Sequence, residues 1–139
     1  MQSYQEAIAA YNQALNLAPD DIYALNNKGL ALQHLGDLQV WLDLPLEVLQ
    51  SYSEAITTYN QALNLAPNYV QILNNKGTAL FLLGLLQIDL SQPQETLKSW
   101  QVALAVFSRC LEIAPDDEYI RNQRDQLQEL LDNLGDETE

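Results

Sequence analysis

The chain has 139 residues and a formal net charge of −13, from 19 acidic and 6 basic residues, and 47% of its residues are hydrophobic. This charge disfavours binding to nucleic-acid phosphates or to anionic membrane surfaces, because both need clustered lysine and arginine. The apolar fraction suffices for a buried core, and the single cysteine, Cys110, excludes an internal disulfide. Basic partners are compatible with the charge, although solubility alone also accounts for it.

No apolar run reaches the length of a membrane-spanning helix. Residues 1–6 lack the basic and apolar regions of a secretion signal. These two features predict a soluble, cytoplasmic protein. Alanine, leucine, glutamine, asparagine and glutamate dominate the composition, which favours helix throughout.

Residues 4–19 recur almost unchanged as residues 52–67. The two copies are YQEAIAAYNQALNLAP and YSEAITTYNQALNLAP, which lie 48 residues apart. A fainter third copy ends at Pro115, again 48 residues further on. Self-similarity at a fixed distance indicates a stacked array of repeats rather than a globule with one central site.

Each copy carries apolar residues spaced three and four apart, which is the pattern of an amphipathic helix. These stripes are Tyr4, Ile8, Tyr11 and Leu15, then Leu49, Tyr52, Ile56, Tyr59 and Leu63, then Leu97, Trp100, Leu104, Phe107 and Leu111. An Ala-Pro pair follows each stripe, and each helix is predicted to end there because the residue before proline avoids helical geometry. Asp20, Asn68 and Asp116 follow as the expected caps of the next helices.

The helices that follow these caps carry matching apolar sets in the first two units. The sets are Ala24, Ala31, Leu35 and Leu38, and then Ile72, Ala79, Leu83 and Leu86. Gly29 and Gly77 lie inside this pattern, although a glycine costs a helix about 1 kcal/mol relative to alanine. A glycine at the same place in both units predicts close backbone approach by a neighbouring helix.

Residues 26–37 (NNKGLALQHLGD), followed by residues 53–67 (SEAITTYNQALNLAP), resemble the tetratricopeptide repeat, a family that pairs two antiparallel helices per unit. Its motif positions are filled by Gly29, Ala55, Tyr59, Ala62 and Pro67, and in the next unit by Gly77, Ala103, Phe107, Cys110 and Pro115. The resemblance implies an all-α, right-handed solenoid of antiparallel helix pairs. Cys110 then stands where the other copies have alanine, and is expected to be a small buried residue.

The family period is about 34 residues, so a spacing of 48 leaves about 14 more residues in each unit. They fall within residues 38–51 and 86–99. Either an inserted loop or two longer helices would accommodate them. Apolar periodicity there favours longer helices, with hairpin turns near residues 42–45 and 89–93 and with Trp41 in the lengthened core or partly exposed at its outer end.

We expect one repeat domain. It comprises a lone helix over residues 1–19, units over 20–67 and 68–115, a capping helix over 116–135 and a tail over 136–139. The capping helix is polar except for an apolar edge formed by Ile120, Leu127, Leu131 and Leu134. Such a polar outer face suits the end of a repeat array.

No catalytic constellation is apparent. His34 is the single histidine and is distant in sequence from Cys110, so neither a metal site nor a Cys-His pair is predicted. Acid pairs such as Asp20-Asp21 stand at helix starts, where the helix dipole favours them. Glycine-rich phosphate loops and calcium loops are absent from the sequence. We expect a non-enzymatic protein with no metal and no cofactor.

In the tetratricopeptide family the first helix of each unit lines a concave groove. Residue by residue, the resemblance implies that role for Tyr23, Asn26, Leu30 and Gln33, then Gln71, Asn74, Thr78 and Phe81, then Tyr119, Asn122, Gln126 and Glu129. Asn26, Asn74 and Asn122 align across the three helices, and side-chain amides can bond the main chain of an extended peptide. The same amides are equally suited to bonding neighbouring helices and setting the curvature of the array.

Lys28, Lys76 and Arg124 also align. Some family members clamp the carboxylate of a peptide with groove cations, but these three lie one or two positions from the places involved. Ion pairs with acids at adjacent helix ends, such as Asp20, Asp21 or Glu54, are the favoured interpretation.

The expected function is therefore a non-catalytic scaffold that binds a protein or peptide, with basic character allowed, in its groove. The alternative is a homo-oligomer formed through the unpaired first helix, whose stripe of Tyr4, Ile8 and Tyr11 could pack on another copy. A further alternative is a regulatory fragment of a larger enzyme.

Overall fold

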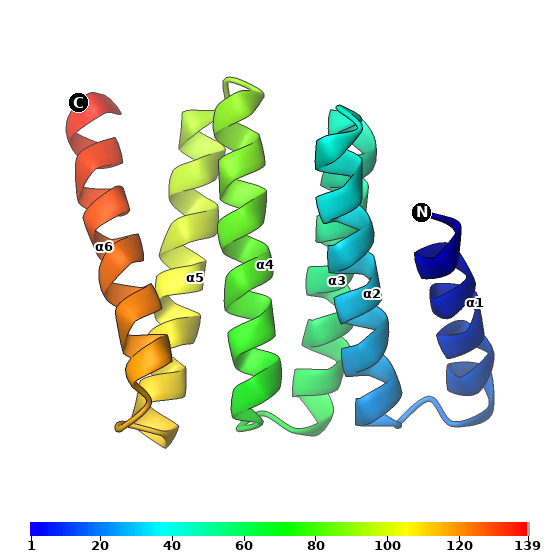
Figure 1. Cartoon of the computed structure of the whole chain (residues 1–139). Helices are drawn as coiled ribbons and strands as arrows, with labels where there is room; N and C mark the ends of the chain where they lie inside the picture. Colours follow the sequence, from blue (N-terminus) through cyan, green and yellow to red (C-terminus); the bar gives the residue numbers. More distant parts are fainter. Residues whose placement is uncertain (139) are drawn as a thin grey trace.

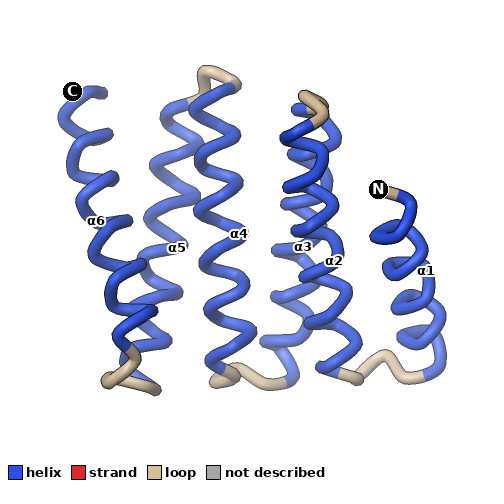
Figure 2. Tube along the Cα trace, in the orientation of Figure 1, coloured by secondary structure: helices blue, strands red, loops and turns tan. Residues whose placement is uncertain are grey.

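The computed structural model describes residues 1–138, with side chains through Asp136, and contains six α-helices over that range. They are α1 (Gln2–Leu17), α2 (Ile22–Trp41), α3 (Pro45–Leu65), α4 (Val70–Asp89), α5 (Pro93–Ile113) and α6 (Glu118–Thr138). The helices stand in a row with alternating direction (Figure 1). The loops that connect them lie alternately at the bottom and at the top of the helices (Figure 2). The all-α array predicted from the sequence is confirmed. Across the described chain, no helix is both long and apolar enough to cross a membrane.

The turns after the Ala-Pro pairs place the helix caps one residue later than predicted. The Asp21 amide donates to the Ala18 carbonyl over 3.2 Å, so Asp20 lies inside a tight turn. The Asp21 carboxylate instead caps α2, accepting from the amides of Tyr23 and Ala24 at 3.0 and 3.1 Å. The corresponding residue before α6, Asp117, likewise accepts from Ile120 at 3.0 Å.

The helices themselves are long, as the sequence favoured, and the hairpin turns are short. Residues 42–44 join α2 to α3, and residues 90–92 join α4 to α5. Both turns contain a residue in the left-handed region, Asp43 with φ 55° and Ser91 with φ 60°. Trp41 stands at this end of the molecule and is 87% exposed, so it lies outside the core.

Buried hydrogen bonds tie the two helices of each hairpin together near its turn. The Ser51 hydroxyl donates to Gln39 Oε1 at 2.7 Å, and the Ser99 hydroxyl donates to Gln87 Oε1 at 2.7 Å. Because all four side chains are buried, each pairing satisfies polar groups that would otherwise be costly to bury.

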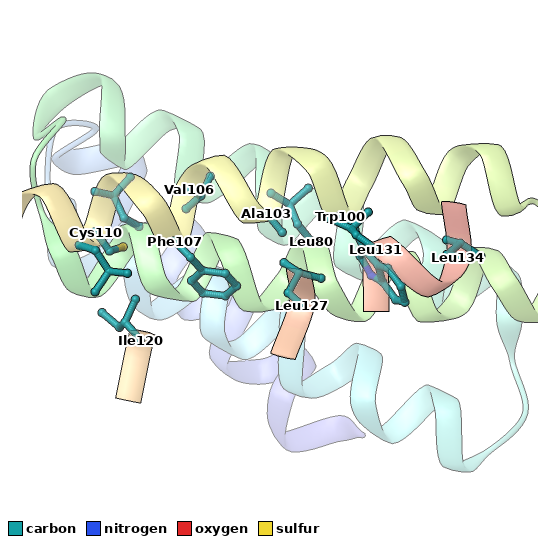
Figure 3. Packing of buried hydrophobic residues seen from close by; sticks show 12 residues of the cluster. Leu80, Trp100, Ala103, Val106, Phe107, Cys110, Ile120, Leu127, Leu131 and Leu134 are labelled. Atoms are coloured by element: carbon teal, nitrogen blue, oxygen red, sulfur yellow. The ribbon is translucent and has the colours of Figure 1, made fainter. Parts of the chain in front are cut away.

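The core is built from aromatic rings that rest on glycines of the facing helix. A Cβ atom at Gly29 would lie 2.4 Å from Tyr59 Cε1, and one at Gly77 would lie 2.6 Å from Phe107 Cε1. The packing role predicted for these glycines is confirmed, although a side-chain ring, rather than a backbone, makes the close approach. Figure 3 shows the cluster around Trp100 and Phe107 on α5, with leucines of α6 packed against it.

The last helix differs from the prediction at its end. Its apolar edge is buried as expected, with Ile120, Leu127, Leu131 and Leu134 all under 10% exposed. However, α6 continues to Thr138, so residues 136–138 belong to the helix rather than to a tail. A single glycine at position 135 costs about 1 kcal/mol, which does not suffice to end a helix. Glu139 lies outside the described residues.

We expect the stability of the protein to fall as the pH rises from 9 toward 10, through Cys110. This thiol is fully buried, and burial, reinforced by the charge of Asp117, raises its pKa from 9.0 to about 11. The unfolded chain therefore releases this proton at a lower pH than the native chain, and alkali favours unfolding. Urea denaturation at several pH values should show a decline that Cys110→Ala flattens; an unchanged decline in that variant would refute this account.

Candidate functional site

The predicted groove surface lies on α2, α4 and α6. The contact between α2 and α4, which we call the first junction, is closed by a hydrogen bond between two side-chain amides. Asn75 Nδ2 on α4 donates to Asn26 Oδ1 on α2 at 2.9 Å. Asn26 is only 9% exposed. Since its side-chain oxygen is committed to the neighbouring helix, Asn26 holds the array together, which is the structural role that the sequence left open for it.

The contact between α4 and α6, the second junction, also has two side-chain amides at the equivalent positions, but they are not bonded to each other in the same way. Asn74 on α4 and Gln123 on α6 stand 48 residues beyond Asn26 and Asn75. Gln123 Nε2 donates to the Tyr119 hydroxyl at 3.2 Å. Asn74 Oδ1 and Gln123 Oε1 are both buried, and neither has a hydrogen-bond partner. Two acceptors on neighbouring groove helices are thus left without donors.

A small cavity of about 100 Å³ lies beside one of these acceptors. It is lined by Thr78 and Phe81 from α4, Phe107 from α5, and Gln123, Gln126 and Leu130 from α6, among others. The structure therefore brings together three residues that the sequence assigned to the groove, namely Thr78, Phe81 and Gln126. Phe81 is half-buried and stacks on Trp100, with 5.6 Å between ring centroids.

The remaining groove candidates have differing exposure. Tyr23 and Tyr119 are 66% and 65% exposed, and Tyr23 meets Tyr69 edge-on, with 6.5 Å between ring centroids. Gln71, Asn122 and Glu129 are also exposed, whereas Leu30 is half-buried.

The predicted groove position of Gln33 is wrong, because this side chain belongs to the core rather than to an open surface. It is buried and its Oε1 accepts from the Tyr59 hydroxyl at 3.1 Å. A buried hydroxyl needs a partner, and Gln33 supplies it. The three aligned asparagines likewise do not form a uniform ladder, since Asn26 is paired, Asn74 lacks a partner for its oxygen and Asn122 is exposed.

The stripe on α1 that the sequence offered for self-association faces the rest of the protein. Tyr4, Ile8 and Tyr11 are all half-buried. The Tyr4 ring lies 5.9 Å from the His34 ring on α2, and Ile8 packs against the cluster that includes Leu25 and Tyr59. Much of the stripe is thus already covered by the next helices.

The aligned cations do not form a clamp, and their predicted ion pairs are wrong. Within the part of the chain that the structure describes, Lys28 and Lys76 make no ion pair, while Arg124 pairs with Asp125 on its own helix at 3.1 Å. Asp21 is occupied in capping α2. Burial without a compensating charge lowers the pKa of Lys76.

Asn75, which closes the first helix junction, and Gln123, its equivalent at the second, were not among the residues predicted from the sequence. The sequence contained a sign of their role, because each follows directly after one of the aligned asparagines, Asn75 after Asn74 and Gln123 after Asn122. Among residues 1–136, no group of histidine, cysteine, aspartate and glutamate is arranged to hold a metal ion.

A row of antiparallel helices, in which neighbours in sequence pack together, defines an α-helical repeat protein. The profile described as TPR repeat matches residues 1–36 and 49–84. That match covers more than half of the chain, so the protein belongs to the tetratricopeptide repeat family, as its motif residues indicated.

Solved structures of this family are similar in fold. The first TPR domain of human RPAP3 aligns over 96% of this chain and 83% of its own, with a TM-score of 0.60 and 19% identity. The first TPR of Spaghetti (RPAP3), bound to the HSP90 peptide SRMEEVD, aligns over 94% and 81%, with a TM-score of 0.55 and 19% identity. The TPR2B domain of yeast Sti1, in a pHsp70 complex, aligns over 98% and 86%, with a TM-score of 0.56 and 22% identity. Among curated proteins, no sequence matches this chain.

The two junctions offer a matched test of the amide pairs. Asn26→Ala should lower the free energy of unfolding by about 1–2 kcal/mol, because it leaves the half-buried Asn75 amide without its acceptor. Asn74→Ala at the equivalent position should cost less than about 1 kcal/mol, because it removes an acceptor that has no donor. Urea denaturation measures both, and equal costs would contradict the difference between the junctions.

Proposed function

We propose that this protein is a non-catalytic scaffold that binds an extended protein segment along α2, α4 and α6. The observation that carries the proposal is the cavity of about 100 Å³ at the second junction, where Thr78 and Phe81 on α4 meet Gln126 on α6. Asn122 and Gln126 are exposed on the same stripe of α6, and their amide groups can donate to and accept from the main chain of an extended segment.

The cavity at the second junction gives the proposed contact a place for a side chain. Its lining combines apolar rings and leucines with the polar groups of Thr78, Gln123 and Gln126. Small-molecule and side-chain pockets commonly have this mixture, in which apolar walls supply affinity and a few polar groups fix orientation. Exposed Tyr23 and Tyr119 extend the surface to either side, and tyrosine is enriched at interfaces.

Structures of similar fold support a peptide as the partner. The Spaghetti domain is bound to an HSP90 peptide, and the yeast Sti1 domain is in a pHsp70 complex. Those partners belong to those proteins, and the chemistry of the present groove favours a different peptide. The net charge is −13, Arg124 is already paired with Asp125 and Glu129 is exposed on the groove stripe. We therefore expect a neutral or basic segment rather than an acidic one.

Selection from a displayed library of random peptides, followed by calorimetry, tests the proposal. Selected peptides should lose about tenfold or more in affinity when Asn122→Ala and Gln126→Ala are combined, because both side chains lie on the groove stripe of α6. Gln128→Ala is the matched control, since Gln128 is exposed on the same helix and bonds Asp132. The synthetic peptide SRMEEVD should show no binding.

Melting temperatures of the double variant and the control should stay close to that of the parent. Equal affinity for all three proteins would refute the groove as the binding surface. Tight binding of SRMEEVD would refute the expected preference for neutral or basic peptides while leaving the groove itself in place.

A further inference from the structure

A second and larger groove lies at the end of the molecule where the hairpins turn. It has a volume of about 700 Å³ and is formed where the end of α2, the start of α3 and the end of α4 meet. Both hairpin turns lie at the top of the helices in Figure 2. We call this region the turn-end groove; its lining includes Asp37, Trp41, Val48, Tyr52, Leu85 and Asp89.

The turn-end groove owes its existence to the residues that lengthen the helices. Most of its lining comes from residues 38–51 and 86–99, the segments that exceed the family period of about 34 residues. A unit of the ordinary length would lack these walls. The groove is therefore separate from the surface on α2, α4 and α6 proposed above, and its occupant has to be argued from its own chemistry.

The floor of the turn-end groove is apolar and its walls expose further apolar side chains. Val48, Tyr52 and Leu86 are buried in the floor. Trp41 is 87% exposed at the rim, and Val40 and Leu85 are exposed beside it. Clustered exposed apolar residues of this kind mark interaction surfaces, and tryptophan is the residue type that most often contributes strongly to binding energy.

The charged residues that line the turn-end groove in the described part of the chain are all acidic, namely Asp37, Asp43 and Asp89. His34 lies outside the lining, with its Nδ1 3.8 Å from Asp37 Oδ2. Asp37 Oδ1 accepts from the Tyr52 hydroxyl at 2.6 Å, which fixes that carboxylate. A second copy of this chain would bring the same three carboxylates against their equivalents, and like charges oppose such a dimer. The complementary surface is apolar and positively charged.

We propose that the turn-end groove binds a basic amphipathic helix of a partner protein. The apolar face of that helix would cover Trp41, Leu85 and the floor, as helices do in hydrophobic grooves. Its lysine or arginine side chains would pair with Asp43 and Asp89 at the rim, and one could lie over the exposed Trp41 indole in a cation–π contact.

A synthetic peptide of about 18 residues, with leucine at helical spacing and lysine elsewhere, is the probe. Two matched peptides accompany it, one with glutamate in place of lysine and one with the lysine and leucine order scrambled. The lysine peptide should bind the full chain, shift the fluorescence of Trp41 to shorter wavelength and bind more weakly as salt rises. The shift should vanish in Trp41→Phe, because Trp100 is already buried.

Variants separate a specific groove from general attraction to an acidic protein. Trp41→Ala should weaken binding about tenfold or more, and Asp43→Asn with Asp89→Asn should weaken it severalfold at low salt. The matched controls are Leu17→Ala, which removes an exposed apolar side chain outside the groove, and Asp116→Asn with Asp132→Asn, which remove the same charge elsewhere. The Asn122→Ala and Gln126→Ala variant should bind the probe normally, so the two proposals can fail independently.

Equal weakening by the control and groove charge variants would overturn the proposal, as would equal binding of the scrambled peptide. Sedimentation across a hundredfold concentration range provides a further check. A rise in mass that Trp41→Ala abolishes would assign the groove to a second copy of this chain and would also overturn the proposal. A constant mass together with the expected pattern of binding would establish it.

Discussion

Replacement of Trp100 with alanine should lower the free energy of unfolding by about 3–5 kcal/mol. The indole is 2% exposed, stacks on Phe81 and donates from Nε1 to the Phe81 carbonyl at 3.0 Å. Its removal leaves a cavity in the largest apolar cluster, where α4, α5 and α6 meet (Figure 3). Guanidinium denaturation followed by helical circular dichroism measures the loss without relying on the fluorescence of the residue removed.

The second tryptophan provides the control for this experiment. Trp41→Ala removes the same side chain from a position that is 87% exposed, and the free energy of unfolding should change by less than about 0.5 kcal/mol. Comparable losses at the two positions would mean that Trp41 packs in the native protein, contrary to the structure.

Gly84→Ala should be the most damaging of the single-methyl additions, with a loss of about 2–3 kcal/mol. The new Cβ atom would lie 2.1 Å from Trp100 Nε1. The indole cannot yield freely, because it is buried and hydrogen-bonded. Overpacking should therefore outweigh the gain of about 1 kcal/mol that alanine brings to a helix.

Two further variants isolate the cause of that loss. Gly135→Ala adds the same methyl group where a Cβ atom would meet nothing within 4 Å, so it should stabilise the protein by up to about 1 kcal/mol. In a Trp100→Ala background, Gly84→Ala should become neutral or stabilising, and denaturation of the double variant would show this as coupling between the two sites. Additive effects would rule out the ring as the obstacle.

Much of the fold was predictable because its determinants are local or repeated. Proline at positions 45 and 93 specifies helix starts directly, so the turns of both hairpins lie close to where they were predicted. The Ala-Pro pairs specify the ends of α1, α3 and α5 in the same local way. The recurrence of Gly29 and Gly77 also predicted a close approach by a neighbouring helix, although an aromatic ring rather than the backbone makes that approach. Only the family resemblance, however, indicated which stripe of α2, α4 and α6 would line a groove.

The sequence did not reveal which polar side chains would satisfy one another across helices. Gln33 was placed in the groove by analogy, but the Tyr59 hydroxyl claims it, and that depends on how deeply a tyrosine ring enters the facing helix. Asn26 and Asn74 occupy equivalent positions, yet only Asn26 has a partner for its oxygen. The difference arises because glutamine in α6 replaces asparagine in α4, and its longer side chain bonds Tyr119 instead.

The turn-end groove was also hidden in the sequence. Trp41 lies on α2, whereas Leu85 and Asp89 lie on α4. The 48-residue spacing relates Trp41 to Asp89, but it does not indicate that the ends of the two helices enclose a groove. They come together only because two hairpins of similar length stand side by side, so the groove is a property of packing rather than of any motif.

The hydrogen bonds that close each hairpin span only 12 residues, and the helices pack chiefly on their neighbours in sequence. Chains with such short-range contacts lose little entropy on loop closure and fold fast for their size. Each hairpin can therefore acquire its native pairing before the next one has formed. During synthesis the earlier hairpin would already present a finished surface to the later one, which limits the time in which apolar stripes are left open to aggregation.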